Sequence, residues 1–172
     1  FLVWNNPKTG RGVYSFCMCP GGHIINSSSE HHHLCTNGMS NSKRNSKFSN
    51  AAIVVSIRPD DFGDDALEGI AFQRMLEERA FAQGGGGFTA PAQRITSFLH
   101  SMSDATLPEI SYRPGCIPGR IDLLLPDTMR QEIAAALPVF NRKMPGFVSN
   151  EGVLVGIETR TSSPVRILRS EG

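Results

Sequence analysis

The feature that most constrains this sequence is an apolar segment that ends at a proline and two glycines. Residues 13–19, Val-Tyr-Ser-Phe-Cys-Met-Cys, combine β-branched, aromatic and sulfur-containing side chains, which favour a largely buried β-strand. Pro20 cannot donate a hydrogen bond to a sheet, and Gly21 and Gly22 adopt positive φ easily. We therefore expect the strand to end there, the chain to reverse, and residues 23–26 to form a second strand.

Two thiols lie near this turn. Cys17 and Cys19 are two residues apart, which on a regular strand places them on the same face. That face ends beside the glycines, where a flat ligand, such as an aromatic cofactor, can approach the backbone closely. The alternative is a tight hairpin in which both thiols are buried and behave as small hydrophobic side chains. The spacing alone favours this structural alternative, and burial would make either thiol inert as a redox or catalytic group.

The length and charge of the chain narrow its class. A chain of 172 residues predicts one domain, or one domain with a smaller lobe. The net charge is +1 and no run of Lys or Arg occurs, which argues against a nucleic acid or an anionic membrane as partner. The longest apolar runs, such as residues 51–57, are too short to cross a bilayer.

The four cysteines and the first residue indicate the cellular context. A chain of this size without a signal peptide is expected to keep its cysteines as thiols in the cytoplasm. Because the chain begins at Phe1 and not at Met, we expect a segment of a longer protein.

The pattern along the chain is strands, then helices, then strands. Residues 51–58 predict a buried strand, and residues 27–49 a polar surface loop. Helices are expected from the acidic stretch 60–65 to Gly84, from Thr89 and Pro91 to about His100, and from Asp127 through Leu137, with a continuation to Met144 after Pro138. Strands are expected again at 152–160 and 164–169.

This order predicts an α+β fold. Residues 1–59 and 146–172 are expected to form a small, mostly antiparallel β-barrel or sheet, and residues 60–145 an inserted helical subdomain of about three helices. Both chain ends would then lie in or beside the sheet, as in a module inserted into a larger chain.

Two further motifs have structural alternatives. Gly84 to Gly87 precede the helix expected at Thr89, and free N–H groups at a helix start can hold an anion. The run lacks the Gly-Lys-Ser/Thr ending of a nucleotide-binding loop, so a hinge between helices is the preferred interpretation.

The second motif is a set of thiols and imidazoles that suits zinc. No C-x2-C pair occurs, and the three consecutive histidines lie in a polar loop, where they are expected to be solvated. The candidate ligands are Cys17, Cys19, Cys35, Cys116, His23 and His31 to His33.

The segment from Glu158 to Arg166 concentrates anion-binding groups. Arg160 and Arg166 are bidentate donors, and hydroxyl groups lie between and beside them. This loop is suited to a phosphate or a carboxylate, and equally to a surface hairpin with a Glu158–Arg ion pair. No Ser-His-Asp triad or paired carboxylates are evident.

Taken together, the motifs resemble a known family, the bacterial FAD-dependent dehydrogenases described as NAD-utilizing dehydrogenases. The resemblance runs through most of the chain, with the three-histidine stretch as a departure within a loop. The residues that carry it are Gly-Arg-Gly-Val-Tyr-Ser-Phe-Cys-Met-Cys-Pro-Gly-Gly at 10–22, Asn-Gly-Met-Ser at 37–40, Gly-Gly-Gly-Phe-Thr-Ala-Pro-Ala-Gln at 85–93, Lys-Met-Pro-Gly-Phe at 143–147 and Glu-Thr-Arg-Thr-Ser-Ser-Pro-Val-Arg-Ile at 158–167.

The resemblance implies a domain of a flavin-dependent oxidoreductase. Members of the family bind FAD on a Rossmann-type half with glycine-rich segments before and after this region, and neither segment is in this sequence. The chain therefore resembles the internal substrate or cap domain, whose partners are the FAD-binding remainder of the same polypeptide and a small-molecule substrate. NAD(P)H is implied as electron donor, and the isolated chain is expected neither to bind FAD tightly nor to catalyse a reaction.

The resemblance also indicates which residues face the flavin or the substrate cleft. The residues expected at the junction with the cofactor are Cys19, Pro20, Gly21, Gly22, Arg160, Thr161, Ser162, Ser163 and Arg166.

The alternative class is a non-enzymatic module that binds a metal through Cys and His or interacts with another protein.

Overall fold

The computed structural model describes residues 1–65, 67–161, 163 and 165, and shows a mixed α+β fold. The strands of this part of the chain form three small sheets, and none of the three closes into a barrel. The strands are β1 (Val3–Asn5), β2 (Gly12–Pro20), β3 (Gly22–Asn26), β4 (Thr36–Ser40), β5 (Ser49–Val55), β6 (Ala90–Arg94), β7 (Cys116–Pro118) and β8 (Val153–Val155).

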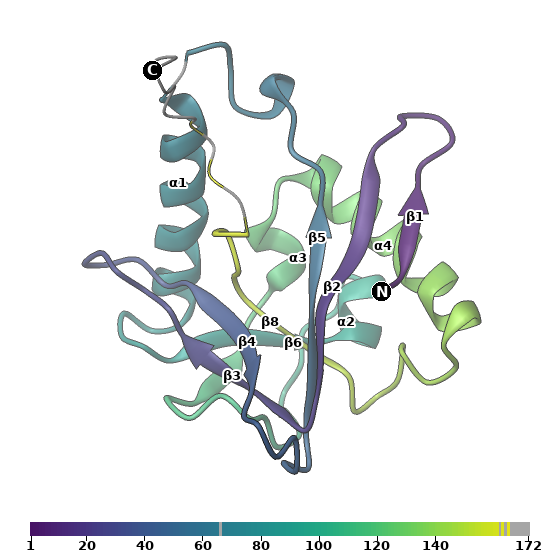
Figure 1. Cartoon of the computed structure of the whole chain (residues 1–172). Coiled ribbons are helices and arrows are strands. Elements are labelled where there is room, and N and C mark those ends of the chain that lie inside the picture. The colour runs from purple at the N-terminus through teal and green to yellow at the C-terminus, as the bar shows by residue number, and fades with distance from the viewer. Residues whose placement is uncertain (66, 162, 164, 166–172) are drawn as a thin grey trace, which may run out of the picture.

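Strands β2 and β3 follow each other but do not pair. β2 lies between β1 and β5, antiparallel to both, whereas β3 pairs with β4. Figure 1 shows the two ribbons, β2 with β5 and β3 with β4, diverging from the end where β2 passes into β3. The chain does turn at Gly21, as the sequence indicates, but a simple hairpin was the wrong expectation because each strand finds its partner elsewhere.

The same region corrects two other expectations. A β-bulge interrupts β2 between Phe16 and Cys19, with Cys17 at a φ of 45°, so the alternation that would place Cys17 and Cys19 on one face is broken. The polar stretch 27–49 is not all loop, because it contains β4 and the fully buried Leu34.

Two strands of the third sheet, β6 and β7, lie within the segment 60–145 that is expected to be helical. β6 is its central strand, parallel to β7 and antiparallel to β8. The helix expected from Thr89 and Pro91 is therefore wrong: Ala90–Arg94 is a strand, and only Ile95–Leu99 is helical. Pro91 has no N–H to donate, but its carbonyl accepts a hydrogen bond from the N–H of Gly156. The first four residues of β6, Pro91 included, are buried.

Two long helices cover the sheets. The sequence correctly indicates α1 (Glu68–Gln83) and α4 (Asp127–Lys143). The short helices α2 (Ile95–Leu99) and α3 (Ile121–Leu124) lie between them in the chain, and η1 (Pro59–Asp61) precedes α1. Pro138 does not interrupt α4. Its ring lies on the exposed side, while Leu137 and Phe140 are fully buried on the other, so packing outweighs the lost backbone hydrogen bond.

The core lies where α4 meets the small helices and β6. Phe98 of α2, Leu124 of α3 and Phe140 of α4 are all less than 2% exposed. At the C-terminal end the described chain forms only β8, so the strand expected over 152–160 is shorter than predicted, and the strand expected over 164–169 falls outside the described residues.

None of the helices in the described part of the chain combines the length and the apolar character that a membrane span requires.

We predict that Gly21→Ala destabilises the fold. Gly21 is buried at a φ of 60°, and a Cβ there would lie 1.9 Å from the carbonyl oxygen of Arg44. Left-handed backbone and a backbone clash together are expected to lower the free energy of unfolding by about 2–4 kcal/mol, measured by urea denaturation.

Gly87→Ala is the matched control. Gly87 is exposed, and a Cβ there would have no atom within 4 Å. Its effect on the unfolding free energy should stay within about 0.5 kcal/mol. Equal effects at both positions would contradict the packing role of Gly21.

Candidate functional site

A cavity of about 640 Å³ opens between the two diverging ribbons. β5 forms one wall, β4 and α1 another, and the segment from β8 to Ser163 a third. Most of the lining is apolar, with Ile53, Phe72 and Ile157 among the larger side chains. An apolar concavity of this size with a few polar groups is the usual form of a small-molecule site.

Polar side chains line the cavity on several sides, from β4, β5 and α1 as well as from its C-terminal wall. Gln73 of α1 lines the cavity, as do Glu158, Thr161 and Ser163 of the segment after β8. Glu158 is the one carboxyl group among the described lining residues. Its pKa is raised because burial penalises the charged form.

Asn50 connects the cavity to the turn between β2 and β3. It pairs with Cys19 in the β2/β5 register, and its amide lies against the backbones of Gly22 and Gly38, where a Cβ would meet it at 2.7 and 2.1 Å. Both polar atoms of the amide are buried, and no described residue bonds to them. Such an amide is costly to bury, and the close glycine contacts hold it in place.

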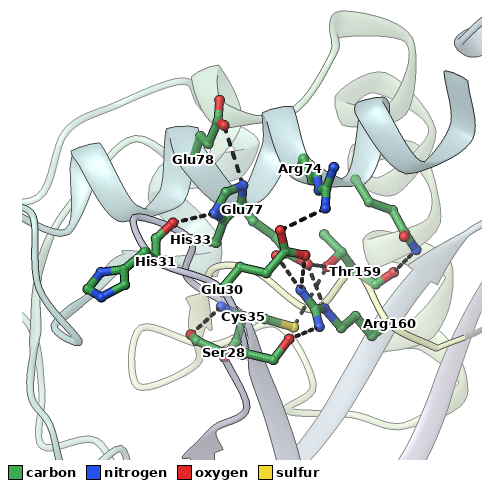
Figure 2. Close-up of polar contacts among 12 residues, drawn as sticks. Ser28, Glu30, His31, His33, Cys35, Arg74, Glu77, Glu78, Thr159 and Arg160 are labelled. Atoms are coloured by element: carbon green, nitrogen blue, oxygen red, sulfur yellow. Dashed lines mark hydrogen bonds and ion pairs between the residues drawn. The ribbon is translucent and has the colours of Figure 1, made fainter. Parts of the chain in front are cut away.

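An ion pair fixes the C-terminal wall to α1 (Figure 2). Glu77 is only 1% exposed at its side chain, and Arg160 binds it through two nitrogens at 2.9 and 2.8 Å. Burial disfavours the charged form of Glu77, but the hydrogen bonds from Arg160 and Thr159 outweigh it, so the pKa of Glu77 lies below its usual value. This is a buried carboxylate kept ionised by a bidentate partner.

Further contacts hold the backbone on both sides of Glu158. The N–H of Thr36 donates to the carbonyl of Ile157 at 2.8 Å, and the amide of Gln73 donates to the carbonyl of Thr159 at 2.7 Å. Arg160 also reaches Glu30 at 3.6 Å. The wall that carries Glu158 is therefore tied to β4, to α1 and to the loop after β3.

The cysteines and histidines do not assemble a metal site among the described residues, where no three His, Cys, Asp or Glu side chains converge. His33 is not solvated as expected: its side chain is 11% exposed, with Nε2 3.3 Å from Glu78 (Figure 2). Cys35 is buried, with its sulfur 3.7 Å from the hydroxyl of Thr159.

The structure separates the residues expected at the cofactor junction. Gly21 and Gly22 are buried beneath the backbones of Arg44 and Met39, whereas Cys19 is half-buried and Pro20 exposed at the same end. None of these four residues lines the cavity, but Cys19 and Pro20 pair with Asn50 and Ser49 of β5, which do.

The C-terminal residues expected at the cofactor junction, as far as the structure describes them, lie at or beside the cavity. Thr161 and Ser163 are exposed at its rim, and Arg160 turns away to Glu77. Ser162 and Arg166 lie outside the described residues. The run Gly84 to Gly87 leads into β6 and not into a helix, so the helix start on which anion binding there depended is absent.

Three residues of the site were not identified from the sequence as such: Glu77, Asn50 and Glu158 in the role of a lone cavity carboxyl. Glu77 is one of several acids along α1 and carries no local signal of burial. Glu158 was interpreted as a partner of an arginine, but the described arginine beside it, Arg160, pairs with Glu77 instead.

Comparison with known proteins gives two matches. The family model described as "FAD-dependent protein, C-terminal domain-like" matches residues 1–161. A protein of Clostridium beijerinckii described as "Uncharacterized protein" is 40% identical, over 98% of this chain and 32% of its own length. The chain thus spans about a third of the length of that relative.

We predict unequal costs for breaking the Arg160–Glu77 pair. Arg160→Ala leaves the buried carboxylate of Glu77 without its cation and should cost about 2–3 kcal/mol of unfolding free energy. Glu77→Gln leaves Arg160, whose side chain is 37% exposed and has Glu30 nearby, and should cost about 1 kcal/mol. Urea denaturation of both variants measures the difference.

The double variant and the pH dependence are the controls. Because the folded-state pKa of Glu77 is lowered, its contribution is complete above the ordinary value of 4.5 and is lost as the pH falls through the folded-state pKa. Glu77→Gln should remove this contribution to the pH dependence of the unfolding free energy. In the Arg160→Ala background, Glu77→Gln should lower the unfolding free energy by less than it does alone. Equal costs for the two single variants would argue against a buried ion pair.

We also predict an order of thiol reactivity. Burial raises the pKa of Cys116 to about 11, so about one molecule in a thousand is thiolate at pH 8. Cys17 is exposed and Cys19 half-buried, so the expectation that both thiols of the turn are buried is wrong, whereas Cys35 is buried. Iodoacetamide at pH 8, followed by peptide mass spectrometry, should modify Cys17 first. Modification of Cys35 or Cys116 before Cys17 would contradict this order.

Proposed function

Because the chain belongs to the family of FAD-dependent protein C-terminal domain-like domains, we propose that it is the substrate-facing cap of an FAD-dependent oxidoreductase. The flavin is held by another part of the same polypeptide, and NAD(P)H is its electron donor. The observation that carries this proposal is the apolar cavity of about 640 Å³, which is large enough for a small molecule.

The described residues do not fit a complete FAD. The diphosphate of FAD needs cationic or backbone donors, and the described lining of the cavity contains no Lys or Arg. Arg160, which lies between the lining residues Thr159 and Thr161 in the chain, is engaged by Glu77 and Glu30. We therefore assign no part of the diphosphate to these residues, and place the cofactor outside this chain.

The role proposed for this chain is to enclose and orient a substrate. Its apolar walls exclude water, while Thr161 and Ser163 at the rim and Cys19 and Pro20 at the turn are proposed to face the junction with the flavin. Arg160 acts as a positioning residue, because it holds the rim against α1. FAD supplies hydride transfer when bound, and the protein contributes orientation and the electrostatic environment.

We do not propose the alternative of a metal-binding module, since its candidate ligands do not converge in the described part of the chain.

The proposal is tested on the full-length polypeptide that contains this chain and on the 172-residue chain alone. We expect about one FAD per full-length polypeptide and bleaching of its absorbance by NADH or NADPH without oxygen. The chain alone should take up no FAD. A full-length protein without flavin contradicts the proposal as a whole, and flavin that neither NADH nor NADPH reduces contradicts the electron donor.

A tryptophan placed in the cavity tests the cap role separately. Ala51 lines the cavity, whereas Ala135 is exposed on α4 outside it. In the flavin-loaded protein, Ala51→Trp should shorten the flavin fluorescence lifetime by quenching, and Ala135→Trp should not. Equal lifetimes in both variants would place the flavin away from this cavity.

A further inference from the structure

Glu158 occupies a built position in the cavity wall. It follows β8, and the two residues beside it are held by Thr36 of β4 and Gln73 of α1 through the bonds described above. Glu158 lines the cavity together with Thr161 and Ser163, and a hydrogen bond from the side chain of Thr161 reaches its carboxyl. Because the backbone is fixed on both sides, the side chain of Glu158 starts from a defined place in the wall.

The described surroundings offer this carboxyl no cation. Among the described lining residues there is no Lys, Arg or His, and the phenol of Tyr14 is the one other titratable group. The nearby guanidinium groups have other partners: Arg160 binds Glu77, and Arg74 binds Glu30 at 3.0 Å. A half-buried carboxylate among apolar walls is unfavourable unless a ligand supplies the opposite charge.

We propose that the cavity binds an apolar small molecule that carries a protonated amino group, which pairs with the carboxylate of Glu158. Thr161 and Ser163 accept further hydrogen bonds from the amine, and the apolar part of the ligand packs against Ile53, Phe72 and Ile157. This inference deepens the proposed function, on which it rests, by naming the class of molecule that the cap encloses.

The raised pKa of Glu158 agrees with this geometry. Burial without a charge partner raises it, and an ammonium group in the cavity would favour the charged form. A negatively charged ligand would meet the same carboxyl as a like charge, so the site should discriminate by the sign of the charge.

The test compares three probes with one apolar body. 4-Phenylbutylamine, 4-phenylbutan-1-ol and 4-phenylbutanoate differ in their terminal group, and their binding to the full-length polypeptide is measured by calorimetry at pH 7.5. We expect the amine to bind at least about tenfold more tightly than the alcohol, a difference of about 1.4 kcal/mol, and the acid to bind most weakly. Equal binding of amine and acid, or no binding of the amine, overturns the proposal.

Variants assign the preference to Glu158. Glu158→Gln should weaken amine binding about tenfold and leave alcohol binding unchanged. Glu151→Gln is the control, because Glu151 is exposed and does not line the cavity. Equal loss for amine and alcohol in Glu158→Gln would indicate a damaged cavity and not a lost charge, and would count against the proposal.

The outcome can be separated from that of the flavin experiments. Calorimetry needs no flavin, and the order of the three probes on the unaltered protein needs no variant to fold. Amine selectivity in a protein without FAD would sustain this inference and contradict the proposed function. A protein that contains FAD but does not prefer the amine would agree with the proposed function and contradict this inference.

Discussion

The ion pair between Glu77 and Arg160 is the contact on which the rest of the candidate site depends. It joins α1 to a segment that has little regular structure after β8, and it does so with a carboxylate that is 1% exposed. Because breaking a buried pair leaves an uncompensated charge, the segment has one strongly preferred position. That position sets the third wall of the cavity and places Glu158 within it.

The second constraint is the sharp turn between β2 and β3. Gly21 packs directly on the backbone near Arg44, and Asn50 wedges between Gly22 and Gly38. These contacts hold together the end of two ribbons that then diverge. A pair of sheets joined at one end and open at the other leaves room that side chains do not fill, which is how a small α+β domain comes to contain a cavity of about 640 Å³.

Local sequence patterns correctly predicted those elements whose conformation does not depend on which other strands they pair with. The helical periodicity of α1 and the apolar residues of β2 and β5 point to what the structure contains, and α4 does begin at Asp127, although Pro126 and not Asp127 is its N-cap. The failure at Thr89 and Pro91 has a specific cause: a Thr-x-Pro start suits a helix locally, but pairing of β6 with β7 and β8 outweighs that preference. Likewise, the bulge at Cys17 could not be anticipated, because it arises from the register with β5.

For the candidate site, too, some features follow from the sequence and others from the tertiary structure. By itself the sequence determined that the chain is a mixed α+β domain, that a turn occurs at Gly21, and that the segment beginning at Glu158 concentrates polar groups near the C-terminal end. Only the tertiary structure decided that Arg160 serves Glu77, so that Glu158 faces an apolar cavity with no described cation beside it. The physical reason is that one guanidinium can satisfy either acid, and which acid is buried beside it depends on helix α1, some eighty residues away in the chain.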